Sequence, residues 1–387
     1  MDATVDTDFA RYFEELPDPR QPHLVRHPLI SVLVIAILAV ISGCDGWQPV
    51  AFWARCKEKW LKTFLKLPNG IPSHDTFGRL FSRLDPNAFE RCFMLWMQGM
   101  IDHSQQRLVA IDGKSIRRSF RRGWDKSGMV HLVSAMVSQG DNRLVFGQLA
   151  VDRKSNEIRA IPSLLKLLDL KKAVVTIDAI GTQRNILEQI IQQGGHYVLP
   201  VKGNQKALAD NIESVMTDLM LDHKKGIPAP VQYHEQAEEG HGRSEVRRLW
   251  YCDAVKLLRP EIRRQWPTIR GIMVVERQRQ DHGAFTGKPG VQRCFYITSL
   301  SKTTAAELAA YIRGHWAVEN NLHWHLDVAF NEDQGRMRVD HAAENHSRLN
   351  RLALNLLKRE KTIKASIRNK QRLAGWDLDY LLRLIST

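Results

Sequence analysis

Four side chains that can bind metals or move protons recur at four-residue steps in HWAVENNLHWHLDV, residues 315–328. They are His315, Glu319, His323 and Asp327. In a helix, residues four positions apart lie on nearly the same face, because one turn takes about 3.6 residues. The segment therefore predicts a helix face that is a metal site, a set of general acids and bases, or a polar surface.

Two aspartates end apolar segments that are typical of buried strands. Asp112 closes LVAID and Asp178 closes AVVTID, and a glycine follows soon after each. Because α/β sheets commonly place their sites at the carboxyl ends of strands, we expect the two carboxylates to converge if the strands are neighbours. Repulsion would then raise one pKa unless a cation lies between them, and oxygen ligands favour Mg²⁺ or Mn²⁺ over zinc. Each aspartate alone is equally compatible with a strand-end cap.

Glu319 supplies a third carboxylate. With Asp112 and Asp178 it could hold two divalent ions about 3.5 to 4 Å apart, an arrangement used in phosphodiester chemistry. We predict these three as catalytic residues and metal ligands, with two Mg²⁺ or Mn²⁺ ions as the cofactor. One alternative is a zinc site of His315, Glu319 and His323, which span about 80° of helix arc and would strain a single ion. The other is an amphipathic helix with half-buried histidines.

Basic and amide side chains flank these carboxylates. IDGKSIRRSFRRGWDK contains Asp112 and VKGNQK closes a later strand, and such density suits contacts to phosphate groups, although each segment is also compatible with a solvated turn. The residues predicted to contact DNA are Lys114, Arg117, Arg118, Lys202, Asn204, Gln205, His241, Arg243, Arg313, His315 and His323. Trp316 and Trp324 could stack on bases, but we expect both to pack in the core.

The elements that hold these residues divide the chain near residue 104. Residues 1–104 predict an all-helical, DNA-binding domain, in which Pro28 starts and Gly43 ends an apolar helix. WQPVAFWARCKEKWLKTFLKL places aromatic residues at helical spacing, and we expect these to lie in the core. Ser73 and Pro86 mark two further helix starts.

Residues 105–387 predict a mixed α/β domain. Three short strands, of which the second and third form a hairpin through QGDN, precede the order helix, strand, helix, strand up to HYVLPVKG. Unbroken apolar strands such as AVVTI belong in a sheet that is covered on both faces. A polar stretch at about 206–300 predicts a β-rich insertion, and residues 301–304 offer caps for a helix that runs to residue 330.

Composition restricts the partners. There are 56 Lys and Arg against 42 Asp and Glu, so the net charge of +14 favours a polyanion, with nucleic acid as the first candidate. Five scattered cysteines without CxxC spacing argue against a disulfide framework and fit a reducing cytoplasm. The acidic, polar start is unlike a secretory signal, and the apolar run of residues 28–43 is shorter than a bilayer span of roughly 20 residues. We expect a cytoplasmic protein without membrane contact.

Taken in order, the segments resemble the H-repeat-associated, ISAs-type insertion-sequence transposases of bacteria, which are DDE transposases. IDGKSIRRSF, HLVSAMVS, VDRKSNEIRAIPSLLKLLDL, VVTIDAIGTQ, YVLPVKGNQ, GHGRSEVRR and IRGHWAVENNLHWHLDVAFNED carry the likeness, which runs from about Asp18 to the C-terminus. The resemblance implies an RNase H-like core with a β-rich insertion. It also implies Mg-dependent DNA cleavage and strand transfer, with Asp112, Asp178 and Glu319 as the triad.

The resemblance further implies double-stranded DNA partners, namely inverted repeats and a target, a homodimer that joins two ends, and association with the nucleoid. The chain departs from the tyrosine, arginine, glutamate, lysine signature of related transposases, because His315 lies four residues before Glu319 and Leu326 seven after it. Arg313 and His323 are candidates to replace the missing phosphate contacts. Since the family includes remnants, the alternatives are a domesticated Mg-dependent nuclease and an inactive DNA-binding protein.

Overall fold

A computed structural model describes residues 8–99, 107–119, 129–139, 142–151, 157–240, 243–253, 255–281 and 290–385. The chain forms two compact units. Unit 1 comprises Met1–Ser104, Gly113–Ala160 and Val318–Thr387, and unit 2 comprises Gln105–Asp112 and Ile161–Ala317. Each unit is thus built from segments that are far apart in the sequence. Three elements cross a boundary between them: β1 (Arg107–Ser115), α7 (Glu157–Leu167) and α11 (Ala305–Val318).

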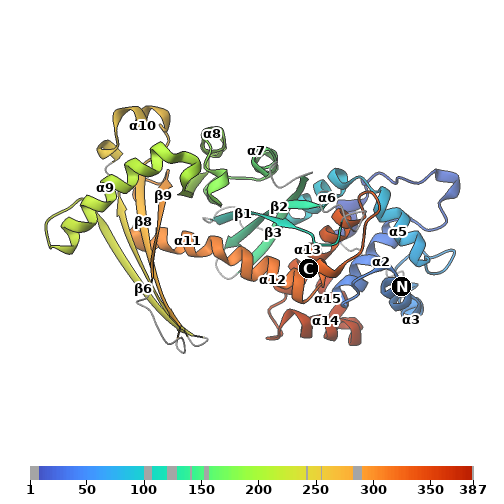
Figure 1. Cartoon of the computed structure of the whole chain (residues 1–387). Coiled ribbons are helices and arrows are strands. Elements are labelled where there is room, and N and C mark those ends of the chain that lie inside the picture. Colours follow the sequence, from blue (N-terminus) through green and yellow to red (C-terminus); the bar gives the residue numbers. More distant parts are fainter. Residues whose placement is uncertain are drawn as a thin grey trace. The chain divides into compact units, whose positions relative to one another are not determined.

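Unit 1 is mainly helical (Figure 1). Its elements in chain order are α1 (Asp8–Phe13), α2 (Leu29–Ile41), α3 (Trp47–Cys56), α4 (Glu58–Leu61), α5 (His74–Arg83), α6 (Pro86–Gln98), β2 (His131–Gln139), β3 (Asn142–Val151), α12 (Trp324–Val328), α13 (Ala342–Arg359), α14 (Ile367–Trp376) and α15 (Leu378–Ile385). The strands β2 and β3 pair antiparallel, which confirms the predicted hairpin. Helix α13 contacts α2, α5, α6 and β3, so the core of this unit surrounds it.

The predicted helix starts and stops in residues 1–104 are confirmed. Gly43 has φ +90°, and the amides of Gly43 and Cys44 donate to the carbonyls of Val40 and Ala39, which is the hydrogen-bonding pattern of a Schellman motif. The hydroxyl of Ser73 accepts from the amide of Thr76 at the start of α5. Pro86 opens α6 behind an Asp85 cap.

Residues 47–67, whose aromatic residues have helical spacing, form two helices. These are α3 and α4, which are separated at Lys57, whose backbone leaves the helical region. The buried face of α3 is formed by Val50, Ala51 and Ala54. Phe52 is exposed, so the aromatic stripe does not lie wholly in the core, because small residues make the closest helix contacts there.

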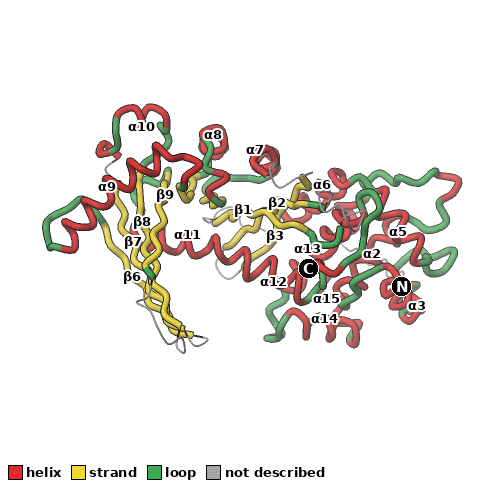
Figure 2. Tube along the Cα trace, in the orientation of Figure 1, coloured by secondary structure: helices red, strands yellow, loops and turns green. Residues whose placement is uncertain are grey.

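Unit 2 contains a mixed sheet with the strand order β1-β4-β5-β9-β8-β7-β6 (Figure 2). The added strands are β4 (Ala173–Ile177), β5 (His196–Val201), β6 (Gln232–Gly240), β7 (Arg243–Cys252), β8 (Gly271–Asp281) and β9 (Val291–Thr298). The strands β1, β4 and β5 run parallel, and the remaining pairs are antiparallel. Every residue of β4 is buried, as expected for an unbroken apolar strand. The predicted mixed α/β class is therefore confirmed.

The helices of unit 2 include two that were not predicted. Helix α8 (Arg184–Gln192) matches its prediction, whereas α9 (Lys206–Lys224) occupies the start of the stretch interpreted as β-rich. Its buried residues Leu208, Ile212, Met216 and Met220 recur every four positions. A short helix α10 (Pro260–Gln265) precedes β8. None of the helices in the described ranges is long and apolar enough to cross a bilayer.

Candidate active site

Asp112 and Asp178 follow paired residues of two neighbouring strands. Strands β1 and β4 are parallel, and their register joins Ile111 to Ile177, the last pair before the two aspartates. Asp178 directly follows β4, whereas Asp112 lies within β1, which continues to Ser115. The expectation that Asp112 ends its strand is therefore wrong, although each aspartate comes directly after the same residue pair of the two parallel strands. Asp112 is half-buried and Asp178 is exposed. Carboxylates placed in this way are suited to a shared cation, because a cation relieves their mutual repulsion.

The loop after Asp178 is held by side chains from the segment after β5. The amide nitrogen Nδ2 of Asn204 donates to the carbonyl of Ala179 at 2.7 Å, and Nε2 of Gln205 donates to the carbonyl of Thr182 at 2.9 Å. The Thr182 hydroxyl in turn donates to the Pro200 carbonyl at 2.7 Å. Asn204 and Gln205 therefore contact the protein's own backbone, which their assignment as DNA donors did not anticipate.

Helix α11 packs on the strands that carry the aspartates. A Cβ at Gly314 would overlap Cδ2 of the Leu108 side chain in β1, so this side chain packs directly on the helix backbone at the glycine. In the next position, Nδ1 of His315 lies 3.2 Å from the hydroxyl of Thr176 in β4. His315 thus faces the sheet two residues before Asp178. Arg313 is on the outer side and forms an ion pair with Glu238 of β6.

The close approach at Gly314 predicts a measurable loss of stability. Gly314→Ala should lower the free energy of unfolding by about 1–3 kcal/mol, because the added methyl group overpacks against the buried Leu108 side chain and forces it to move. Gly203→Ala is the matched control, since no atom lies within 4 Å of its Cβ position. Urea denaturation would measure both, and Leu108→Ala should rescue part of the Gly314→Ala loss. Equal stability of the two alanine variants would contradict the close approach of helix and strand.

Glu319 opens a π-helical segment, Glu319–His323, that follows α11. The amide of Trp324 donates to the carbonyl of Glu319, five residues back, so the four-residue steps of an ideal α-helix do not hold here. Glu319 is exposed, whereas Val318 and Leu322 are buried. π-Bulges are frequent at functional sites, and this one changes the direction in which Glu319 and the residues after it project.

A half-buried lysine donates a hydrogen bond to the backbone of the π-segment. Nζ of Lys358 in α13 donates to the carbonyl of Asn321. Burial lowers the pKa of Lys358 to about 7, and repulsion by Arg143 and Lys361 adds to the effect. Burial, together with the charge of Lys358, also lowers the pKa of His325 to about 4, so this histidine is neutral at physiological pH.

Lys114, predicted to contact DNA, is engaged within unit 1. Its side chain is only 8% exposed, and Nζ forms ion pairs with Asp327 and, at 3.2 Å, with Glu332. Glu332 also contacts Arg351 of α13 at 3.1 Å. Sequence reasoning missed this buried network, although charged residues within the largely apolar face of α13 were a signal that could have indicated it.

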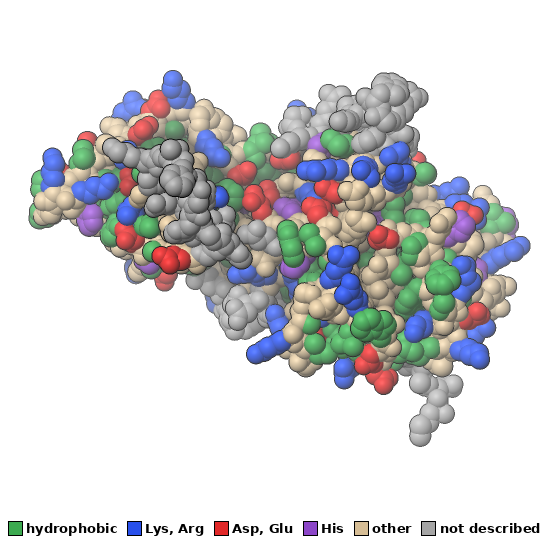
Figure 3. Space-filling model, turned by 60° about the horizontal axis from the view of Figure 1, so that its bottom comes forward, with side chains coloured by type: hydrophobic (Ala, Val, Ile, Leu, Met, Phe, Trp, Pro, Cys, Tyr) green, Lys and Arg blue, Asp and Glu red, His purple; other side chains and the backbone are tan. Residues whose placement is uncertain are grey.

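The other predicted DNA contacts differ in exposure. Arg117 is 79% exposed and pairs with Asp333, and the exposed Arg118 has φ +64°. Lys202 is exposed, and His323 is half-buried. His241 lies outside the described residues, as does the side chain of Arg243. Basic side chains are spread over the face drawn in Figure 3, with acidic and apolar ones between them.

The prediction that Trp316 and Trp324 pack in the core is wrong. Both are exposed, at 47% and 54%. Each instead has an edge-on contact with a neighbouring histidine, His315 for Trp316 and His325 for Trp324. Their apolar neighbours in the sequence, Val318, Leu322 and Leu326, provide the buried face.

The described residues do not contain a group of three His, Cys, Asp or Glu side chains that is close enough to hold a metal ion. Asp112 and Asp178 belong to unit 2 and Glu319 to unit 1. The alternative zinc site of His315, Glu319 and His323 has no support from this geometry, since the π-segment alters their spacing.

Comparison with known proteins identifies the family. Residues 103–356 match the family described as transposase DDE domain, and residues 10–97 match its associated N-terminal family, DDE_Tnp_1-associated. The chain is 36% identical over 371 residues to the "H repeat-associated putative transposase YhhI" of Escherichia coli K12, and the match covers 96% of both chains. It is 37% identical to the "Putative transposase YncI" of E. coli O157:H7, covering 97% of this chain and 94% of that one. The chain therefore belongs to the H-repeat-associated transposases of the DDE family.

Proposed function

We propose that the protein cleaves DNA at the ends of its insertion sequence and joins the freed 3′ hydroxyl to target DNA. The observation that carries the proposal is the register of β1 and β4, in which Asp112 and Asp178 directly follow the paired residues Ile111 and Ile177. DNA with terminal inverted repeats is the proposed substrate. A homodimer is proposed because two ends must be joined, and association with the nucleoid follows from the same substrate.

Asp112, Asp178 and Glu319 are proposed to hold two Mg²⁺ or Mn²⁺ ions. The donor set fits such ions, because it consists of oxygen ligands and the carboxylate of Asp178 is open to solvent. When bound, ions of this kind lower the pKa of the attacking hydroxyl and offset charge on the leaving oxygen. The side chains themselves need no covalent step. Asn204 and Gln205 fix the loop behind Asp178, and the exposed Arg117, Arg118 and Lys202 are proposed to contact phosphates.

Cleavage of a labelled duplex tests the proposal. The duplex carries the inverted repeat that flanks the gene, a shuffled duplex of equal length is the control, and each is incubated with Mg²⁺, Mn²⁺ or EDTA. We expect metal-dependent cuts at the repeat boundary only. Equal cutting of both duplexes would indicate a nonspecific nuclease instead. Binding without any cutting would indicate an inactive DNA-binding protein.

The hydrogen bond from Asn204 to the Ala179 carbonyl predicts an effect on the rate. Asn204→Asp removes the NH₂ donor and places a carboxylate against a carbonyl, so the loop that carries Asp178 loses its support. We expect cleavage to fall by about 10- to 100-fold, the usual cost of losing a residue behind a metal ligand. DNA affinity measured in EDTA should stay within about twofold of the wild type, because the variant adds only one carboxylate and keeps every basic side chain that could contact phosphate.

Asn185→Asp is the matched control for this variant. It makes the same chemical change at an exposed position of α8. Cleavage by this variant should remain close to the wild-type rate. If Asn204→Asp and Asn185→Asp cleave equally well, the support of the Asp178 loop by Asn204 has no functional role.

A further inference from the structure

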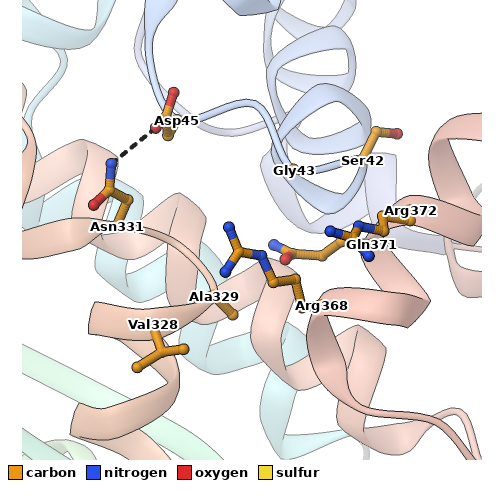
Figure 4. A pocket seen from close by; sticks show the side chains of 9 residues that line it. All are labelled: Ser42, Gly43, Asp45, Val328, Ala329, Asn331, Arg368, Gln371 and Arg372. Carbon is orange, nitrogen blue, oxygen red and sulfur yellow. Dashed lines mark hydrogen bonds between the residues drawn. The ribbon is translucent and has the colours of Figure 1, made fainter.

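Unit 1 contains a polar pocket that the proposed chemistry does not use. It has a volume of about 450 Å³. Three segments enclose it: the turn that ends α2, the segment that follows α12, and one face of α14 (Figure 4). A Cβ at Gly43 would lie 3.8 Å from Cβ of Gln371, so α14 packs directly on the turn. All the residues that line the pocket thus belong to unit 1.

Gln371 contributes a buried amide group to the wall of this pocket. Its side chain is 3% exposed, and its Nε2 has no hydrogen-bond partner among the described residues. Figure 4 shows its amide group directed into the same space as the guanidinium of Arg368. Because a buried N–H group without a partner is costly, its presence at a pocket wall indicates a ligand that accepts a hydrogen bond.

The charges that line the pocket indicate an anion. Arg368 and Arg372 lie one turn apart on α14, and in the described part of the chain neither guanidinium forms an ion pair with a carboxylate. Asp45 is the acidic residue of the lining, and it accepts a hydrogen bond from Nδ2 of Asn331 at 3.1 Å. The lining therefore contains two guanidinium groups and one carboxylate, and the carboxylate already has a hydrogen-bond partner. Paired arginines and an amide donor match the geometry of a phosphate group.

An exposed tryptophan extends the same helix face. Trp376 follows Arg372 by four residues, as Arg372 follows Arg368, so the three lie along one side of α14. Its side chain is 77% exposed, and its distance along the helix from Arg372 is about 6 Å. Packing does not explain an indole in this position. An aromatic ring beside a phosphate site is the arrangement that binds nucleic acid strands through base stacking.

We propose that the pocket binds a backbone phosphate of a DNA strand and that an adjacent unpaired base stacks on Trp376. The inference rests on the proposed function, in that DNA is the substrate, and it adds a second DNA-binding region separate from the carboxylates. An unpaired base is required, because bases within a duplex already stack on one another. The ligand is therefore an opened end or a displaced strand.

Binding measured in EDTA tests this inference. The probes are a labelled 20-nucleotide single strand and the matching blunt duplex, followed by fluorescence anisotropy at several salt concentrations. In Arg368→Ala/Arg372→Ala, single-strand affinity should fall about tenfold or more at low salt, and the salt slope should decrease by about 0.7 for each phosphate that the variant no longer neutralises. In Trp376→Ala, single-strand affinity should fall about 5- to 100-fold with an unchanged slope. Gln371→Met should weaken binding several-fold, also without a change in slope.

Arg263→Ala/Arg264→Ala on α10 is the matched control, since it removes the same charge from two exposed arginines of unit 2. The proposal is overturned if the α14 pair loses no more affinity than this control. The part of the proposal in which a base stacks on Trp376 is overturned if Trp376→Ala binds the single strand with wild-type affinity. Because the assay contains no metal, these results do not depend on cleavage. A protein that fails to cut can still show the expected losses, and one that cuts can lack them.

Discussion

Asp178→Asn should reduce metal-dependent cleavage at the repeat boundary by about a thousandfold or more. The carboxylate is expected to hold cations that stabilise the transition state by several kcal/mol, and each 1.4 kcal/mol corresponds to about a factor of ten in rate. The amide of asparagine retains the size of the side chain but not its charge. DNA affinity in EDTA should remain within about twofold, so that the loss can be assigned to chemistry. Single-turnover cleavage of the labelled duplex would measure it.

The structure makes the comparison with Asp112 informative. Both aspartates follow a paired residue of parallel strands, so Asp112→Asn should have a similar effect. If the two carboxylates act as one site with Glu319, combining Asp178→Asn with Glu319→Gln should cost little more than either change alone, because residues that act as a unit are not additive. If the fold-losses in cleavage rate of the two single variants instead multiply in the double variant, Asp178 and Glu319 have independent roles.

Asp218→Asn is the control for the charge change. Asp218 is an exposed residue of α9 in the same unit. Its removal should leave the cleavage rate unchanged. Full activity of Asp178→Asn, or an equal loss in Asp218→Asn, would contradict the assignment of Asp112 and Asp178 as the catalytic pair.

The parts of this site that could be predicted from the sequence depend on local patterns. An apolar run followed by Asp indicates a buried strand with a carboxylate near its end, which holds for Asp178 directly after β4, whereas β1 continues past Asp112. The sequence did not show that the two strands are neighbours, which is seen only in their pairing. The cap of Ser73 and the stop at Gly43 likewise follow from backbone hydrogen bonds within a few residues. Helix α9 was also predictable, because its buried residues recur every four positions, but the surrounding turn residues and strands obscured it.

The remaining features depend on interactions between distant segments. Nothing local to Glu319 predicts a π-segment, whose Asn321 carbonyl accepts from Lys358 in another helix. Likewise, Lys114 has the sequence setting of a phosphate contact, yet two carboxylates more than 200 positions later bind it. The amide groups of Asn204 and Gln205 are similar cases. A single polar residue in a loop does not show whether its partner is DNA or backbone, because both present oxygen acceptors.

The buried network around Glu332 leads to the largest expected effect on stability. Glu332→Gln should lower the free energy of unfolding by about 3–5 kcal/mol, because it leaves the fully buried Arg351 without a counter-charge. Glu332 also accepts a hydrogen bond from Ser347 at 2.7 Å and pairs with Lys114. Replacing one partner of such a pair costs far more than the pair itself contributes. Urea denaturation at pH 7 would measure the difference.

Asp333→Asn is the matched control, at the next position in the chain. Asp333 pairs with the exposed Arg117 at 3.3 Å, so water screens this interaction and its loss should cost less than about 1 kcal/mol. A similar loss in the two variants would contradict the view that burial of Arg351 makes Glu332 critical. A Glu332→Leu/Arg351→Met double variant should be more stable than Glu332→Leu alone, because it removes the uncompensated charge.

The same carboxylate gives the protein a defined sensitivity to acid. Although burial opposes ionisation, Arg351 and Lys114 lower the pKa of Glu332 from its ordinary 4.5 to about 2. A depressed carboxyl pKa stabilises the folded state fully above pH 4.5, and this contribution is lost as the pH falls toward 2. The difference in unfolding free energy between wild type and Glu332→Gln should therefore be constant from about pH 7 to about 5 and shrink by about 3 kcal/mol as the pH approaches about 2. A difference that stays constant throughout this range would show that the ion pairs of Glu332 do not stabilise the fold.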